Sequence, residues 1–213
     1  MNELIICLFI LVAYLIGSLP TAVWIGEIFF KTDVRNYGSG NAGATNTIRV
    51  LGKTAGFSVL AIDVFKGLTA TMLVPFLMYQ GVVDSQYRTF LELIFGVSAV
   101  AGHIYPIFAY FKGGKGVATL LGMVMCIHFE IALICMAVFL IVFSISHYVS
   151  LGSMLAALSF PVALLFPRFH PQENLALIVG FLLFLLVVYT HKANVKRLIV
   201  GEESKLYLSK TKN

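Results

Sequence analysis

The hydrophobic positions of the chain fall into seven apolar segments separated by shorter polar stretches. An α-helix needs about 20 apolar residues to cross the roughly 30 Å hydrocarbon core of a bilayer, and most of the segments approach or exceed that length. The pattern therefore predicts an all-α integral membrane protein with seven transmembrane helices. The predicted spans cover residues 4–30, 55–79, 90–111, 115–129, 131–148, 152–166 and 174–190.

Two of the predicted spans share one continuous apolar stretch, from Val117 to Val149. This stretch is too long for a single membrane helix and barely sufficient for two. His128 and Glu130 are the residues that mark a break in it. We therefore divide the stretch at these two residues and expect short helices on both sides.

The first span contains the sequence Gly17-Ser18-Leu19-Pro20, which predicts a kink. Proline interrupts the helical hydrogen bonds, and a membrane helix tolerates this where neighbouring helices satisfy the freed carbonyl groups. We therefore expect this break to serve helix packing.

The composition agrees with a membrane protein. Of the 213 residues, 59% are hydrophobic and 12% are charged, and the mean hydropathy is +0.92. Soluble domains carry about 25% charged residues. Cys7, Cys126 and Cys135 are odd in number and lack metal-ligand spacing, so we expect neither disulfides nor a metal site. Without an internal repeat or a low-complexity linker, residues 1–213 are expected to form a single membrane-embedded domain.

Lysine and arginine residues are concentrated after the first, third and last predicted spans. The opposite side of the membrane holds only Arg88 and Arg168. Because cytoplasmic loops retain Lys and Arg, we expect the N-terminus outside and the C-terminus in the cytoplasm. The net charge of +5 does not indicate a nucleic-acid partner, since no basic helix or RNA-binding signature accompanies it. The basic residues on the predicted cytoplasmic side are Lys31, Arg35, Arg49, Lys53, Lys112, Lys115, Lys192, Lys196, Arg197, Lys205, Lys210 and Lys212.

The longest connection, from Lys31 to Thr54, is rich in small polar side chains. Hydroxyl and amide groups interleaved with glycine suit the wrapping of a polyol or a phosphate ester, although a plain structural loop is the alternative. Gly38, Gly40 and Gly43 also match the GxGxxG dinucleotide fingerprint, but the strand that this motif requires is missing, so we reject it. The candidate binding residues of this loop are Ser39, Gly40, Asn41, Thr45, Asn46 and Arg49.

A glycine-rich turn, Lys112-Gly113-Gly114-Lys115-Gly116, lies between the third and fourth spans. Glycines allow the backbone to approach a ligand and to direct several N–H groups toward it, and the helix that follows adds its positive end. The two lysines suit phosphate, and Lys115, between glycines, is the less hindered of the two. A positive-inside loop with flexible glycines explains the same residues equally well.

Asp63 and Lys66 lie inside the second span, where charged groups are costly and mark either a functional path or a buried pair. They are three residues apart on one helix face, so we favour an intrahelical pair over direct contact with substrate. For His103, in the third span, we favour a hydrogen bond to a neighbouring helix over a direct part in chemistry.

A third polar segment follows the last span. On a continuing helix, His191, Asn194 and Arg197 are spaced by three residues and share a face. A basic membrane anchor explains the cations of this segment but not His191 and Asn194. Ser150, in another predicted cytoplasmic loop, is expected to add a hydroxyl group to the same cytoplasmic site.

Three cytoplasmic segments together resemble the motifs of the acyl-phosphate-dependent glycerol-3-phosphate acyltransferase family of bacteria. They are GSGNAGATNTIRVLGK at 38–53, FKGGKGVAT at 111–119 and HKANVKRLIVGEE at 191–203, and the likeness covers essentially the whole chain. The resemblance implies a multi-pass enzyme of the bacterial cell membrane, with seven helices and an active site facing the cytoplasm. It implies acyl transfer from acyl phosphate to the 1-hydroxyl of glycerol 3-phosphate, giving 1-acylglycerol 3-phosphate for phospholipid synthesis.

The resemblance also assigns roles to individual residues. It implies no cofactor and no protein general base, because the phosphoryl group of the acyl phosphate takes the hydroxyl proton. Its implied partners are the bilayer, the two substrates, and enzymes that form the acyl phosphate and acylate the product. Glu202 matches an acid with a structural role. The implied catalytic residues are Ser39, Arg49, Lys115, His191 and Asn194, and the phosphate-binding turn comprises Lys112, Gly113, Gly114, Lys115 and Gly116.

Other classes of protein fit the sequence less well. No acidic residue stands five positions after any histidine, so the HxxxxD pair of thioester-dependent acyltransferases is missing, and the absence of GxSxG disfavours a serine acyl-enzyme. A transporter of an organic phosphate or other anion, with Asp63 and Lys66 in its pathway, is the main alternative. It is disfavoured because the polar groups crowd one face of the membrane. A scaffold subunit would not need the glycine-lysine turn.

Overall fold

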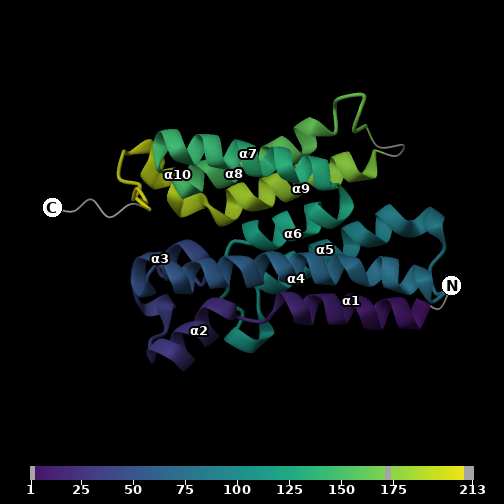
Figure 1. Cartoon of the computed structure of the whole chain (residues 1–213), viewed down its shortest axis with the longest axis horizontal. Coiled ribbons are helices and arrows are strands. Elements are labelled where there is room, and N and C mark those ends of the chain that lie inside the picture. Colours follow the sequence, from purple (N-terminus) through teal and green to yellow (C-terminus); the bar gives the residue numbers. More distant parts are fainter. Residues whose placement is uncertain (1–2, 171–173, 209–213) are drawn as a thin grey trace. The chain divides into compact units, whose positions relative to one another are not determined.

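The computed structural model describes residues 3–170 and 174–208 of the chain. Every regular element in this part is a helix, as the apolar pattern predicted. The chain forms two compact units that meet in sequence between Phe129 and Glu130. Figure 1 shows the helices of both units with their labels.

The first unit is organised around α4 (Lys53–Tyr79), the longest helix among the described residues. It packs against α1, α2, α3, α5 and α6, and its neighbour α1 runs alongside it in Figure 1. The other elements of this unit are α1 (Glu3–Gly17), α2 (Thr21–Phe30), η1 (Val34–Asn36), α3 (Ala44–Leu51), η2 (Ser85–Tyr87), α5 (Arg88–Ile104), η3 (Ile107–Ala109) and α6 (Val117–Ile127).

Glycines allow α4 and α6 to pack closely. Gly67 on α4 faces the carbonyl group of Thr119, and Gly122 on α6 faces the carbonyl group of Val64. A Cβ atom at either glycine would overlap the facing backbone, so these two positions set the spacing of the helices. Membrane helices rely on such close packing because lipid supplies no hydrophobic drive between them. A buried apolar cluster packs nearby, formed by Ile6, Ala13, Ala70, Val74, Leu77, Val83, Leu91, Phe95 and Ala99.

The predicted kink in the first span is confirmed. Helices α1 and α2 are bent by 43° relative to each other, with Ser18, Leu19 and Pro20 between them. The break leaves carbonyl groups without helical partners, and Lys66 Nζ of α4 donates to the Leu19 carbonyl at 2.6 Å. A neighbouring helix thus satisfies the break, as the sequence led us to expect.

The described part of the second unit contains α7 (Phe129–Ser146), α8 (Val149–Ala163), α9 (Leu175–Thr190) and α10 (Lys192–Ile199), and α8 packs against α9. Helix α10 is bent by 66° from α9, so the expectation of one continuing helix through His191 is wrong. The reason is local: Thr190 Oγ1 and His191 Nδ1 both bond the Val187 carbonyl, at 2.9 and 2.8 Å. Side chains that compete for the carbonyl groups of a last turn help to end a helix there.

Three stretches of the described chain are individually long and apolar enough to cross a membrane, and five if each bent pair counts as one span. The break predicted at His128 is confirmed, because α6 ends just before this residue and α7 begins just after it. Helix α6 has 11 residues and is short, as expected, whereas α7 has 18 and is long enough to span. The three individual stretches are Lys53–Tyr79, Ser85–Ala109 and Phe129–Ser146, and the shorter apolar helices are Val117–Ile127 and Val149–Ala163.

Candidate active site

The glycine-rich turn at residues 112–116 folds back onto the C-terminal end of α5. The N–H of Gly113 donates to the Ile104 carbonyl at 3.2 Å, and the N–H of Gly114 donates to the His103 carbonyl at 3.1 Å. Both N–H groups are therefore engaged within the protein. This corrects the expectation for Gly113 and Gly114, because their N–H groups fix the turn against α5 instead of pointing at an anion.

The donors suited to an anion lie slightly later, at the start of α6. Gly116 caps this helix with φ of 82°, in the left-handed region that favours glycine. The N–H groups of a first helical turn have no carbonyl one turn earlier to accept them, and the helix end is positive. Lys115 directly precedes Gly116 and is half-buried, whereas Lys112 is exposed. The two predicted lysines therefore differ in exposure, and Lys115 is the one that adjoins these donors in the chain.

The connection from Lys31 to Thr54, here called the first loop, contains the short helix α3, and Asn46 on this helix is fully buried and holds the connection together. Its Nδ2 donates to the carbonyl groups of Val34 at 2.7 Å and Tyr37 at 3.1 Å. Its Oδ1 accepts from the N–H of Ser39 at 2.8 Å. Because both amide hydrogens are used, Asn46 has no donor left for a phosphate, and its predicted binding role becomes a structural one. Of the other predicted ligands in this loop, Ser39, Gly40 and Arg49 are exposed, and Asn41 and Thr45 are half-buried.

Arg35 links the first loop to the segment that precedes the glycine turn. Its guanidinium bonds both carboxylate oxygens of Asp33, at 2.7 to 3.0 Å, and its Nη1 donates to the Ala109 carbonyl at 3.2 Å. The hydrogen bonds from Arg35 lower the pKa of the Asp33 carboxyl, and the bond to Asp33 raises the pKa of Arg35. Sequence reasoning treated Arg35 only as a topology charge. The acid two residues earlier was the signal that could have identified the pair.

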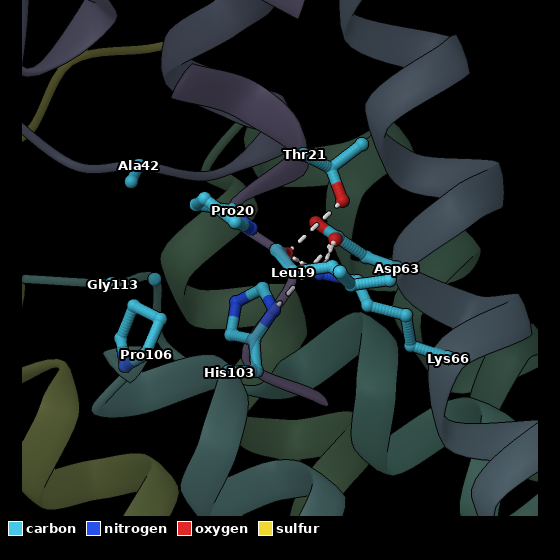
Figure 2. A pocket seen from close by; sticks show the side chains of 10 residues that line it. Leu19, Pro20, Thr21, Ala42, Asp63, Lys66, His103, Pro106 and Gly113 are labelled. Atoms are coloured by element: carbon cyan, nitrogen blue, oxygen red, sulfur yellow. Dashed lines mark hydrogen bonds and ion pairs between the residues drawn. The ribbon is translucent and has the colours of Figure 1, made fainter. Parts of the chain in front are cut away.

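A pocket beside the turn is lined by Asp63 and Lys66 of α4 and by His103 of α5, together with Gly113 and Gly114 (Figure 2). Lys66 Nζ lies 2.6 Å from Asp63 Oδ1, which confirms the predicted intrahelical pair. His103 Nδ1 lies 3.7 Å from the same oxygen. The Asp63 and Lys66 side chains are only 3% and 4% exposed. Sequence analysis identified the three side chains separately, and the fold brings them together.

In the second unit, the carboxylate of Glu203 joins polar groups of the third motif to Ser150 of α8. It accepts hydrogen bonds from Ser150 Oγ at 2.7 Å and from Asn194 Nδ2 at 2.6 Å. Arg197 Nε donates to its second oxygen at 2.7 Å. The structural role expected of Glu202 therefore belongs to Glu203, since Glu203 is buried and Glu202 is exposed. Two adjacent acids are equivalent in a motif, and only burial distinguishes them.

His191 is buried at the break between α9 and α10. Its Nδ1 lies 2.8 Å from the Val187 carbonyl, which can only accept, so in the neutral ring Nδ1 carries the proton and Nε2 is the acceptor. His191 belongs to the second unit, with Asn194 and Ser150. That the residues of both units serve one site stays a prediction. The predicted catalytic residues of the first unit are Ser39, Arg49 and Lys115.

Replacing Glu203 with glutamine is expected to destabilise the segment after α10, more at neutral than at acidic pH. Burial alone would raise the pKa of Glu203, but hydrogen bonds from Asn194, Ser150 and Arg197 hold that pKa below its ordinary value. A lowered folded-state pKa adds stability above the unfolded value of about 4.3 and loses it as the pH falls through the folded-state pKa.

The measurement is the thermal unfolding midpoint of both proteins in detergent micelles, between about pH 3 and pH 7 to bracket the glutamate titration. The gap between wild type and Glu203→Gln should narrow as the pH falls. Glu202→Gln, at the exposed neighbour, is the matched control and should follow the wild type. A gap that stays constant over this pH range would contradict the role of the Glu203 charge.

The chain is similar to known proteins over most of its length. The family model of glycerol-3-phosphate acyltransferase matches residues 7–201. The glycerol-3-phosphate acyltransferase of Staphylococcus aureus (strain Newman) is 41% identical over 205 residues, which cover 95% of this chain and 98% of that protein. The counterpart from strain JH9 is 40% identical over the same shares.

Two solved structures are also similar. One is the crystal structure of PlsY (YgiH), an integral membrane glycerol 3-phosphate acyltransferase, in its glycerol 3-phosphate form. It matches with a TM-score of 0.80 and 36% identity, over 95% of this chain and 96% of that chain. The lysophosphatidic acid form of PlsY matches with a TM-score of 0.80 and 33% identity, over 95% of each chain.

Proposed function

The chain belongs to the glycerol-3-phosphate acyltransferase family, and from this we infer that it acylates glycerol 3-phosphate and produces lysophosphatidic acid. We propose that the donor is an acyl phosphate and that the acceptor is the 1-hydroxyl group. One observation carries the acylation of glycerol 3-phosphate: the match to PlsY, which is solved in a glycerol 3-phosphate form and a lysophosphatidic acid form. These two molecules are the acceptor and the product of one acyl transfer.

In the proposed reaction, the 1-hydroxyl oxygen attacks the acyl carbon of the acyl phosphate. The bond between the acyl carbon and the phosphoryl oxygen breaks, and inorganic phosphate leaves with the hydroxyl proton on one of its oxygens. The intermediate carries an oxyanion, and two phosphate-bearing substrates bring further negative charge, so fixed cations and N–H donors should supply most of the rate. The groups of the first unit suited to this are Lys115 and the N–H donors at the start of α6.

The choice of donor tests this proposal. Purified protein in detergent micelles should form labelled lysophosphatidic acid from acyl phosphate and labelled glycerol 3-phosphate, and it should not do so from acyl-CoA or acyl carrier protein. The reason is that acyl phosphate brings its own proton acceptor, whereas a thioester requires the HxxxxD pair that the sequence lacks. Comparable turnover with acyl-CoA as the sole donor would overturn the donor assignment. Failure with every donor would overturn the acyltransferase function itself.

We propose seven membrane spans, with the N-terminal end outside and the C-terminal end in the cytoplasm. The count adds the short apolar helices α6 and α8 to the five spans that include the bent pairs. In a cysteine-free variant, single cysteines at the exposed positions Tyr37, Lys112 and Lys192 should be shielded from an impermeant thiol reagent in intact cells, because positive loops stay inside. A cysteine at Arg168 should be labelled. Labelling of any of the first three from outside would refute a cytoplasmic site.

The remaining proposals concern the whole chain. Both units are proposed to work as one membrane-embedded acyltransferase domain, because the family model runs across the boundary between them, from residue 7 to residue 201. The substrate requires a preceding reaction that forms an acyl phosphate, and the product retains a hydroxyl group that a second acylating enzyme can use. The bilayer is the expected environment for both acylated molecules.

A further inference from the structure

We propose that Lys66, Asp63 and His103 form a buried positioning group that sets the place of the glycine turn, and through it the place of Lys115. The group itself does not contact substrate in this proposal. The inference rests on the proposed function, since it concerns the turn that would bind phosphate in that reaction.

The imidazole of His103 is the surface on which Gly114 lies. A Cβ atom added to Gly114 would overlap His103 Nε2 and would lie 3.1 Å from both Cδ2 and Cε1 of the same ring. The backbones of the two residues are also joined, because the Gly114 N–H donates to the His103 carbonyl at 3.1 Å. Side chain and backbone of one residue thus define the position of Gly114, and only glycine fits there.

The imidazole also lies beside the buried ion pair, at a distance that makes a charge contact but no hydrogen bond. Figure 2 shows the His103 ring with one nitrogen directed at Asp63, and Nδ1 lies 3.7 Å from Asp63 Oδ1. Asp63 is held by Lys66 at 2.6 Å, and Lys66 also donates to the Leu19 carbonyl at 2.6 Å. A continuous series of contacts therefore runs from the break between α1 and α2 through α4 to the turn. Buried charges are costly unless they are paired, so Asp63 and Lys66 hold each other in place, and the pair in turn packs against the His103 ring.

Lys115 directly follows Gly114, so a shift of Gly114 also shifts the lysine and the start of α6. A misplacement of about 1 Å, even when it originates away from the chemistry, can cost about 10²-fold in rate. The buried group is therefore expected to affect catalysis through the geometry of the turn.

The test is a double-mutant cycle between Gly114→Ala and His103→Ala, measured as kcat/KM for acyl transfer in micelles. Gly114→Ala should lower kcat/KM by about 10²-fold, because the new methyl group displaces the turn. His103→Ala should lower it by about 10-fold, because the turn loses its support but not its backbone bonds. The double variant should recover about 10-fold relative to Gly114→Ala, since removal of the imidazole makes room for the methyl group.

Gly113→Ala provides a matched control. A Cβ atom there would overlap the backbone oxygen of His103 and would lie 2.7 Å from the Ile104 carbonyl oxygen and 2.6 Å from Pro106 Cδ. Removal of the His103 side chain leaves all three atoms in place. His103→Ala should therefore not rescue Gly113→Ala, and equal rescue of both glycine variants would overturn the proposed contact.

A second measurement follows the conformation of the turn in the absence of substrate. A spin label on Lys112→Cys, in a cysteine-free background, should show a changed spectrum in Gly114→Ala and a restored spectrum in the double variant. Recovery of the spectrum without recovery of kcat/KM would overturn the positioning role, and recovery of neither would overturn the contact. If the wild type makes no lysophosphatidic acid, the proposed function fails. The spectra alone then decide whether the His103 ring positions the turn.

Discussion

Replacing Lys115 with alanine is expected to lower the turnover number by roughly 10²–10³-fold or more, the range for losing one preorganised electrostatic group. Lys115 is half-buried and directly precedes Gly116, which caps α6, so its backbone lies at the start of that helix. A cation in a fixed place stabilises phosphate or oxyanion charge more in the transition state than in the ground state. Because Lys115 is only half-buried and is not among the buried charged residues, the fold should survive the change.

Steady-state kinetics on folded Lys115→Ala and Lys112→Ala, side by side, provide the measurement. Lys112 is exposed in the same turn, so its replacement should change turnover much less and serves as the control. Lys115→Arg should restore little activity, because the planar guanidinium is larger than an ammonium group and the flanking glycines are fixed by their contacts. Near-normal turnover of Lys115→Ala would mean that the turn is only a positive-inside topology signal.

Replacing Asp63 with alanine is expected to destabilise the protein by about 3–5 kcal/mol, the usual cost of removing one partner from a buried ion pair. Lys66 is only 4% exposed, and the change would remove its counter-charge. Its bond to the Leu19 carbonyl would remain. The double variant Asp63→Leu with Lys66→Met removes both charges and should cost less than Asp63→Ala alone. The free energy of unfolding in detergent micelles measures all three proteins.

An exposed ion pair of the second unit is the matched control. Arg168 lies 2.9 Å from Glu130, but the side chains are 72% and 55% exposed. Arg168→Ala should therefore change the free energy of unfolding by less than about 1 kcal/mol. Similar losses for Asp63→Ala and Arg168→Ala would show that burial does not govern the Asp63 pair.

Part of the candidate site could be predicted because its determinants are local. Asp63 and Lys66 are spaced to meet on one helix face whatever surrounds them, and the structure confirms the pair. Pro20 stands two residues after a Gly-Ser pair, a local combination that favours a kink, and the bend between α1 and α2 is present. The prediction failed at the end of α9, where the side chains of the helix itself help to end it. Thr190 and His191 are compatible with a continuing helix by residue type, and only the structure shows that both bond the Val187 carbonyl.

The sequence by itself determined the all-helical membrane class, the break at His128 and the presence of a glycine-lysine turn before a helix. Only the tertiary structure decided which polar groups are used within the protein. Asn46, Gly113 and Gly114 use their N–H donors on backbone carbonyls, and Glu203 rather than Glu202 is the buried acid. The physical reason is that apolar periodicity and residue spacing act within one segment. The fate of a hydrogen-bond donor, in contrast, depends on which distant carbonyl or carboxylate packs against it.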